Sequence, residues 1–248
     1  MFHVKLRPDA DSEPPIPVAS IRDALAQIGV RSSADQAARL AVHARMVLDA
    51  NKRFNLTRIC EPADVVTLHI ADSALAIEAV QGAPAGKLAD LGSGAGYPGV
   101  VLAILGERPT LLVESVKKKA RFLSTVVLEL GAGMDVFPGR AEDLARERAG
   151  EFAVVTARAV APLPSLVELA APLLRQGGRL VAMKAKPEAA ELLAGLKAAR
   201  VCGMREVSRT ATILAGEHTR TLVVYERVGS PAVRLPRRVG LAQQVPLG

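Results

Sequence analysis

The chain has 248 residues, half of them apolar, and a formal net charge of +7 at pH 7. Such a chain can bury a substantial core, but no stretch of it reaches the roughly 18 consecutive apolar residues of a membrane span, which argues against an integral membrane protein. The positive charge favours a polyanionic partner, although charge alone does not identify one.

The N-terminal part of the chain divides into a lead-in and a helical segment. Residues 1–17 combine acidic residues with four prolines and lack the apolar core of a signal peptide, so we expect a disordered lead-in and a cytoplasmic protein. Residues 18–80 show helical periodicity, with Ser33 placed as an N-cap, and predict a helical N-terminal extension. The polar stretch "NKRFNLTRI" (51–59) interrupts this pattern.

The next part of the chain, residues 81–228, alternates short apolar strands with longer amphipathic stretches. We expect strands at 87–92, 110–115, 134–139, 152–159, 179–185, 205–210 and 220–228, and helices at 98–105, 117–130, 141–148, 163–175 and 187–200. This alternation predicts an α/β domain: a mostly parallel sheet of about seven strands with helices on both faces. Residues 229–248 are expected to form a basic, irregular tail. The two lone cysteines lack metal-ligand spacing, so no metal site is expected.

The first of these strands runs into a glycine-rich loop, "DLGSGAGYPG". Gly94, Gly96 and Gly99 have the spacing G-x-G-x-x-G, and Glu114 lies about 20 residues on, where an acid can bind ribose hydroxyls. These features alone fit a dinucleotide-binding enzyme. Asp90, however, would repel a pyrophosphate and would suit a ligand that carries an ammonium and a sulfonium group. The loop therefore predicts S-adenosylmethionine as the cofactor, in a Rossmann-like methyltransferase fold.

The residues at the ends of the later strands limit which methyl acceptors are possible. Ala141 and Glu142 follow the third strand and would lie beside the adenine ring, although Glu142 could also serve only the dipole of its helix. After the fourth strand, "TARAVAPL" lacks the Asp or Asn with Pro-Pro and an aromatic residue that amine methyltransferases place there. Neither Cys60 nor Cys202 lies at a strand end as a nucleophile for carbon methylation. What remains is an acceptor that needs no deprotonation, such as a ring nitrogen with a free lone pair.

Several motifs in a fixed order resemble the GidB (RsmG) family, bacterial small-subunit ribosomal RNA methyltransferases that modify the N7 of a guanine. They are "NLT" (55–57), "HIADS" (69–73), the glycine loop, "KKARFL" (118–123), "GRAEDL" (139–144), "ARA" (157–159) and "AMKA" (182–185). The resemblance runs from about residue 34 to the end of the chain. It implies S-adenosylmethionine as the cofactor and 16S ribosomal RNA, or an assembling small subunit, as the partner of a protein that we expect to be a monomer.

The resemblance also implies the roles of single residues. It puts around the cofactor Gly92, Tyr97, Ala141, Glu142 and Arg158. It puts Lys184 and Asn55 near the methyl acceptor, so that Arg158 and Lys184 are the expected catalytic residues. The alternative for these two cations is an ion pair with Asp90 or Glu142.

Two residues of the motifs are interpreted differently. Tyr97 stands where many relatives have an aliphatic residue. His69 and Asp72 are interpreted as structural, because a histidine near a helix end more often caps the helix or packs in the core.

Basic residues near the middle and the end of the chain are the candidates for RNA contact. They are Lys117, Lys118, Lys119, Arg121, Arg237 and Arg238, with Arg234 nearby; the alternative is a solvated helix face and a solvated tail. Two other functions stay open. A small-molecule methyltransferase would carry a lid richer in aromatic residues than the 3% found here. A catalytically silent RNA-binding protein would have no need of the intact glycine loop with Asp90 and Glu114.

Overall fold

The computed structural model describes residues 16–131 and 133–248, and a seven-stranded sheet of order β3-β2-β1-β4-β5-β7-β6 runs through its centre. The strands are β1 (Leu88–Leu91), β2 (Thr110–Val113), β3 (Met134–Phe137), β4 (Phe152–Arg158), β5 (Leu174–Lys184), β6 (Met204–Leu214) and β7 (His218–Arg227). The first five are parallel, and the β6–β7 hairpin continues the sheet in antiparallel fashion. The predicted mostly parallel sheet is confirmed. Strand order reverses between β1 and β4, and ligands of such sheets bind at the carboxyl ends of the strands near this point.

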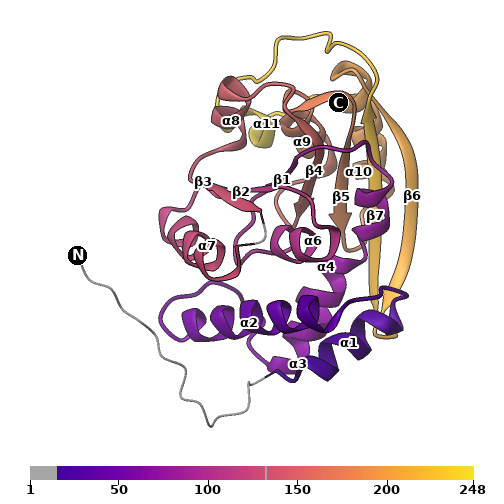
Figure 1. Cartoon of the computed structure of the whole chain (residues 1–248). Coiled ribbons are helices and arrows are strands. Elements are labelled where there is room, and N and C mark those ends of the chain that lie inside the picture. Colours follow the sequence, from indigo (N-terminus) through magenta and orange to yellow (C-terminus); the bar gives the residue numbers. More distant parts are fainter. Residues whose placement is uncertain (1–15, 132) are drawn as a thin grey trace, which may run out of the picture.

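Side chains of the central strands alternate between two hydrophobic cores, one on each face of the sheet. In β1, Leu88 belongs to one core and Ala89 to the other, and Val154 and Val155 of β4 divide in the same way. One core lies against α6 (Gly99–Gly106) and α7 (Lys117–Leu130), and the other lies against α8 (Ala141–Glu147), α9 (Leu163–Ala170) and α10 (Ala189–Val201) (Figure 1). Burial on both faces explains why these strands are nearly continuous apolar runs.

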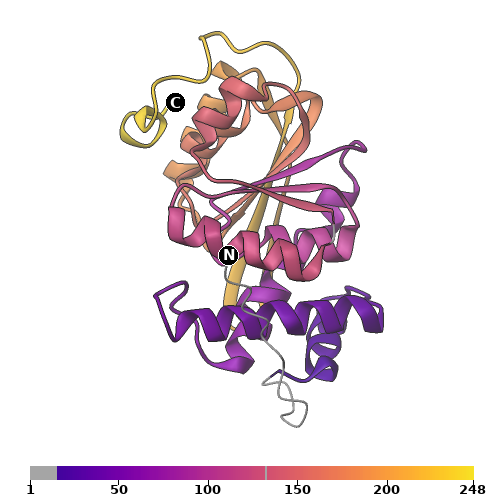
Figure 2. The ribbon, with the colours of Figure 1, turned by 60° about the vertical axis from the view of Figure 1, so that its left-hand side comes forward.

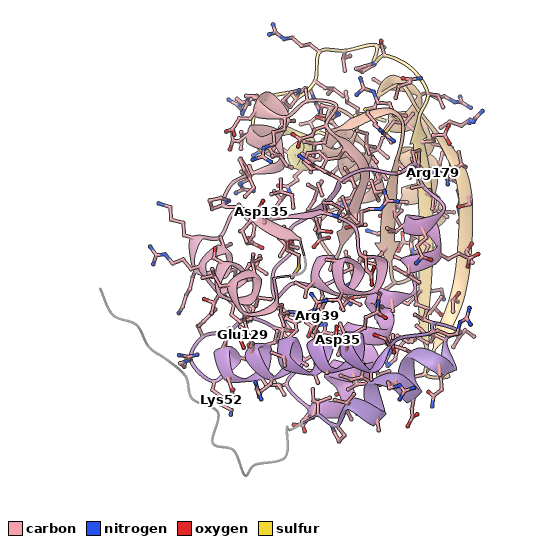
Figure 3. All side chains as sticks on the ribbon, in the orientation of Figure 1. Asp35, Arg39, Lys52, Glu129, Asp135 and Arg179 are labelled. Atoms are coloured by element: carbon pink, nitrogen blue, oxygen red, sulfur yellow. The ribbon has the colours of Figure 1, made fainter. Side chains whose placement is uncertain are left out.

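The N-terminal helices form a further layer next to α6 and α7 (Figure 2). They are α1 (Val18–Gln27), α2 (Ala34–Asn51), α3 (Pro62–Asp64), the π-helix η1 (Val65–Ala71), α4 (Asp72–Ala74) and α5 (Ile77–Gln81). Ser33 caps α2 as predicted, in a capping box with Gln36. Arg39 of α2 donates to the carbonyl oxygen of Leu130 at the end of α7 (3.1 Å), and both α2 and α7 contribute to the same core (Figure 3). The N-terminal helices are thus part of the core of the sheet.

The polar stretch 51–59 is a loop, as its interruption of the helical pattern suggests. Asn51 organises it: its Oδ1 accepts hydrogen bonds from the backbone N–H groups of Leu56 (2.7 Å) and Thr57 (2.9 Å). Because Leu56 is buried, the loop is tied to the core at this point. Asn55 is exposed beside it.

Three elements differ from the sequence expectation. α9 ends at Ala170 instead of 175, because Pro172 cannot continue a helix. β5 begins at Leu174 instead of 179, with an irregularity in its pairing to β4. β6 extends to Leu214; its side chains are mostly exposed, so the apolar alternation that marks a strand is weak there.

The two ends of the chain also differ from expectation. Residues 1–15 of the expected lead-in lie outside the described residues, whereas Ile16 is buried and Pro17 is the N-cap of α1. The tail is not irregular throughout, because it contains a helical turn, α11 (Leu241–Gln244), with Ala242 buried. In the described parts of the chain, no helix combines the length and the apolar character needed to cross a bilayer.

Candidate active site

Asp90 lies beneath the glycine loop and orders it. Its Oδ2 accepts a hydrogen bond from the N–H of Gly99 (3.1 Å), the first residue of α6, and its Oδ1 accepts one from Thr156 Oγ1 of β4 (2.8 Å). A Cβ at Gly99 would lie 2.6 Å from Asp90 Oδ2, so the loop approaches this closely only with glycine there. The carboxylate is fully buried, and burial raises its pKa to about 6. The carboxylate therefore stabilises the N-terminus of α6, and its expected contact with the cofactor stays a prediction.

The upper side of the loop forms a backbone cradle. Gly92, Gly94 and Gly96 all have positive φ angles, of 65°, 57° and 99°. A Cβ at Gly94 would meet only the carbonyl oxygen of Gly92, at 3.8 Å, so the loop is open to a ligand on this side. Glu114, at the end of β2, accepts hydrogen bonds from the N–H groups of Gly94 (2.9 Å) and Val116 (2.7 Å). An open backbone cradle beside a carboxylate fits S-adenosylmethionine, whose ribose hydroxyls need acceptors.

Tyr97 of the loop packs between two buried histidines. His69 of η1 stacks on its ring with centroids 4.4 Å apart and an interplanar angle of 10°, and His43 of α2 lies 4.7 Å away, tilted by 43°. His43 Nε2 donates to the carbonyl oxygen of Ala95 (2.8 Å). Burial lowers the pKa of His43 to about 4; burial and then the charge of Arg158 lower that of His69 to about 3. Neutral imidazoles of the N-terminal helices therefore hold the glycine loop.

Arg158, at the end of β4, is fixed by the HIADS segment. It donates to the carbonyl oxygen of Leu68 (3.0 Å), to Asp72 Oδ2 (2.7 Å) and to His69 Nδ1 (3.0 Å). Asp72 Oδ1 accepts a further hydrogen bond from Arg220 Nε of β7 (2.7 Å). One buried carboxylate thus bridges two guanidinium groups. Arg158 does form an ion pair, but its partner is Asp72 and not Asp90 or Glu142.

Lys184 ends β5 close to Arg158. Its Nζ pairs with Glu191 of α10 (2.8 Å) and donates to the carbonyl oxygen of Ala161 (3.1 Å). Lys184, Arg158 and Arg220 line one cavity of about 510 Å³ at the carboxyl ends of β4 and β5. Apolar side chains complete its wall, among them that of Met183. The cavity can therefore take a flat ring against apolar groups and a charged or carbonyl group against the cations.

His69, Asp72 and Arg220 line this cavity but were not predicted as site residues. His69 and Asp72 were interpreted as structural, although their spacing in "HIADS" puts both on the side of η1 and α4 that faces the cavity. Arg220 carried no local signal, because it joins Asp72 across 148 positions of the chain through the β6–β7 hairpin.

The two residues expected beside the adenine ring lie in the first turn of α8. Ala141 is the first residue of α8. The carboxylate of Glu142 faces the C-terminal tail, where its Oε1 accepts a hydrogen bond from the N–H of Gly240 (2.7 Å). Glu142 can therefore touch a cofactor through its backbone, while its side chain is engaged elsewhere.

The candidate RNA-binding residues divide into two groups. Lys117, Lys118 and Arg121 are exposed at the start of α7, and Lys118 Nζ lies 4.3 Å from the ring centroid of Phe54, so this end of α7 adjoins the loop 51–59. The same first turn contains the half-buried Lys119. In the tail, Arg238 is exposed, but Arg237 forms a short ion pair with buried Glu168 (2.6 Å) and is not a free phosphate contact.

The sequence and the fold are similar to those of known proteins. Residues 36–222 match the GidB family model, described as "rRNA small subunit methyltransferase G". The chain is 35% identical over 227 residues to ribosomal RNA small subunit methyltransferase G of Desulfitobacterium hafniense (89% of this chain, 93% of the relative). It is 40% identical over 228 residues to the protein of that name in Rubrobacter xylanophilus (88% and 87%).

Similarity to solved structures concerns the fold alone. The 1,6-didemethyltoxoflavin-N1-methyltransferase of Burkholderia thailandensis, solved with 1,6-didemethyltoxoflavin and S-adenosylhomocysteine, matches with a TM-score of 0.50 at 15% identity. The match covers 64% of this chain and 77% of that chain.

Proposed function

The chain belongs to the GidB family of small-subunit ribosomal RNA methyltransferases, and on this premise we propose that it transfers a methyl group from S-adenosylmethionine to the N7 of a guanine in 16S ribosomal RNA. The observation that carries the proposal is the position of His69, which contacts both Tyr97 of the glycine loop and Arg158 of the cavity wall. A cofactor cradle and a basic cavity therefore adjoin, as methyl transfer requires. We further propose that the protein acts as a monomer in the cytoplasm, on ribosomal RNA or an assembling small subunit.

The glycine loop and its neighbours would hold the cofactor. When bound, S-adenosylmethionine supplies a methyl group on a positively charged sulfur. We assign the backbone of Gly92, Gly94 and Gly96 and the packing of Tyr97 to its binding. Glu114 would accept hydrogen bonds from the ribose hydroxyls, because each of its oxygens has a lone pair beyond the one used by the loop. The backbone of the first turn of α8, Ala141 and Glu142, would border the adenine ring.

The cavity residues position a base and do not need to deprotonate it. Guanine N7 has a free lone pair, so no general base is required. Because positive charge develops on the base, Arg158 and Lys184 are placed more favourably at the guanine carbonyl oxygen, a phosphate or the cofactor carboxylate than at N7 itself. Asp72 and His69 would keep Arg158 in the orientation that this contact needs.

RNA would approach across the loop 51–59 and the start of α7. Asn55 and the exposed cations of the first turn of α7 lie on this side, and the contact between Lys118 and Phe54 joins the two segments. We include Arg238 of the tail as a candidate phosphate contact. Each phosphate contact on single-stranded RNA should add about 0.7 to the slope of binding against the logarithm of salt concentration.

Methylation of undermodified small-subunit RNA tests this function directly. The protein is incubated with labelled S-adenosylmethionine and either naked 16S RNA or small subunits from a strain without this modification. We expect label at one guanine. Treatment with borohydride and aniline should cleave the RNA chain at that position, as it does at 7-methylguanine. Arg205→Ala, at an exposed position on β6, serves as the control for Arg158→Ala. Label that enters only small molecules, or none at all, would refute the proposal.

A further inference from the structure

The C-terminal segment 235–247 is fastened to α9 by one buried carboxylate. Arg237 donates to Glu168 through Nε (2.6 Å) and Nη2 (2.6 Å) in a fork geometry, and the side chain of Glu168 is only 3% exposed. Leu247 N–H donates to the same carboxylate (3.3 Å). Glu168 therefore holds both ends of this segment, and a buried carboxylate that is paired in this way does not release its partner without a large desolvation cost.

A second contact joins the segment to the first turn of α8. Gly240, with φ +81°, donates its N–H to Glu142 Oε1 (2.7 Å), and Glu142 is 7% exposed. Among the described residues, none supplies a side-chain cap to α8, whose N-cap residue is Arg140. The bond from Gly240 thus ties the side chain of Glu142 to the C-terminal segment.

Apolar packing makes the segment part of the fold. Ala242 is buried, and Leu235 and Leu247 pack against the core that α8, α9 and α10 share. Arg237 Nη2 also donates to the carbonyl oxygen of Val245 (2.6 Å), which closes the segment on itself. In Figure 1 the segment crosses from the end of β7 to place α11 beside α8 and α9. The segment is therefore packed against the protein and is not the solvated tail that the sequence analysis gives as an alternative.

The first turn of α8 lies at the cofactor end of the sheet. It follows the carboxyl end of β3, and Glu114 N–H donates to the carbonyl oxygen of Phe137, the last residue of β3 (3.1 Å). A displacement of α8 would therefore act on the region beside Glu114, where the proposed function puts the ribose and adenine.

We propose that residues 235–247 form a strap that sets the position of the first turn of α8 and thereby the affinity for S-adenosylmethionine. Arg237, Glu168 and Gly240 are positioning residues in this arrangement, and Arg237 leaves the set of RNA contacts. The inference rests on the proposed function, because it takes the cofactor to bind beside α8.

Titration of the full-length protein with S-adenosylhomocysteine by calorimetry tests the strap. Arg237→Ala should raise the dissociation constant about tenfold, because a segment released from Glu168 no longer fixes the first turn of α8. Arg205→Ala removes the same charge from an exposed position on β6, outside the segment, and should leave this constant unchanged. Glu142→Gln keeps an oxygen acceptor for Gly240 and should bind nearly as well as the wild type, whereas Glu142→Ala should not. The salt slope of RNA binding should be the same for Arg237→Ala and the wild type.

Hydrogen exchange separates the strap from the methyltransferase function. In Arg237→Ala we expect faster exchange at residues 141–147 and unchanged exchange at 117–130. Failure of the wild type to bind S-adenosylhomocysteine would refute the proposed function. Unchanged exchange in α8 of Arg237→Ala would refute the strap, whether or not the cofactor binds. Equal dissociation constants for Arg237→Ala and the wild type, together with a reduced RNA salt slope, would restore Arg237 as an RNA contact. Should Arg237→Ala not fold, Arg237→Lys, which keeps the charge and loses the fork, is measured in the same way.

Discussion

Arg158 Nη2 donates a hydrogen bond to His69 Nδ1 at 3.0 Å, and the same imidazole stacks on the ring of Tyr97. Because Nδ1 is the acceptor, the proton of neutral His69 lies on Nε2, which is 2.9 Å from Thr57 Oγ1. One ring therefore connects the loop 51–59, the glycine loop and the cationic wall of the cavity.

Replacement of His69 should separate its ring contact with Tyr97 from its hydrogen-bonding contacts with Arg158 and Thr57. His69→Phe keeps a ring against Tyr97 but removes the acceptor for Arg158, so the single-turnover rate should fall by about tenfold or more while cofactor affinity stays within about twofold. His69→Ala loses both contacts and should weaken cofactor binding as well. Calorimetry and rapid-quench measurements on both variants check this. A wild-type rate in His69→Phe would show that Arg158 needs no support from the imidazole.

Arg158→Ala and Lys184→Ala should each reduce the single-turnover rate at saturating cofactor and RNA, because each removes a cation that positions the base. The wild-type rate should be flat between pH 6 and 9, since a guanine N7 has no proton to lose. The measurement is a pH profile of methyl transfer. A rate that climbs tenfold per pH unit through this range would reveal an essential deprotonation and point to an amine or carbon acceptor.

Glu114→Ala should weaken cofactor binding by about 1.5 to 3 kcal/mol, because it removes the acceptor for the ribose hydroxyls and for Gly94 N–H. Glu129, exposed on α7 and labelled in Figure 3, provides the matched control, since Glu129→Ala removes the same charge away from the site. Titration with S-adenosylhomocysteine compares the two. Similar affinities would mean that Glu114 serves only the backbone of the loop.

Acid should destabilise the fold through its buried histidines. The pKa values of His43 and His69 are about 4 and about 3 in the folded protein, against 6.5 for an ordinary histidine. Below pH 6.5 both histidines are protonated in the unfolded chain but stay neutral in the folded chain. The free energy of unfolding should therefore fall by about 1.4 kcal/mol per pH unit for each histidine, down to about pH 4.

Asp90 opposes part of this effect. Its pKa is raised from 3.8 to about 6, so the folded state takes up a proton earlier than the unfolded state, and stability from this group rises as pH falls from 6 to 3.8. Because two histidines act against one carboxyl group, the free energy of unfolding should still decrease as the pH falls. Urea unfolding from pH 7 to 4.5 measures it. His43→Gln should flatten the slope, and an unchanged slope would show that His43 is not neutral in the folded protein.

The architecture was predictable because its signals are local. Strands buried on both faces, such as "FAVVTA", are continuous apolar runs, and Ser33 marks the start of α2 because it directly precedes the helical periodicity. The resemblance implied Arg158 and Lys184, and the predicted strands placed each near the end of its strand. The predicted end of α9 and the predicted start of β5 were less accurate. For β5, the local pattern does not show where pairing with β4 begins.

The partners of the charged side chains were not predictable in this way. Asp90 occupies the expected place, but the side to which its carboxylate turns depends on Thr156, 66 positions later. Arg237 was expected to contact RNA, because nothing near it in the sequence indicates its partner, Glu168 of α9. Such pairs are decided by tertiary packing, and neither member shows its partner in its own neighbourhood.

The π-helical form of η1 gives this segment a tolerance in length. Hydrogen bonds in a π-helix span one residue more than in an α-helix, so a π-helical turn accommodates one residue more. Deletion of one residue, such as Thr67, would allow the segment to close as an ordinary α-helix while the residues on either side stay nearly in phase. In an alignment, a gap of one residue between 65 and 69 should therefore be compatible with a histidine and an aspartate that keep their places in the cavity.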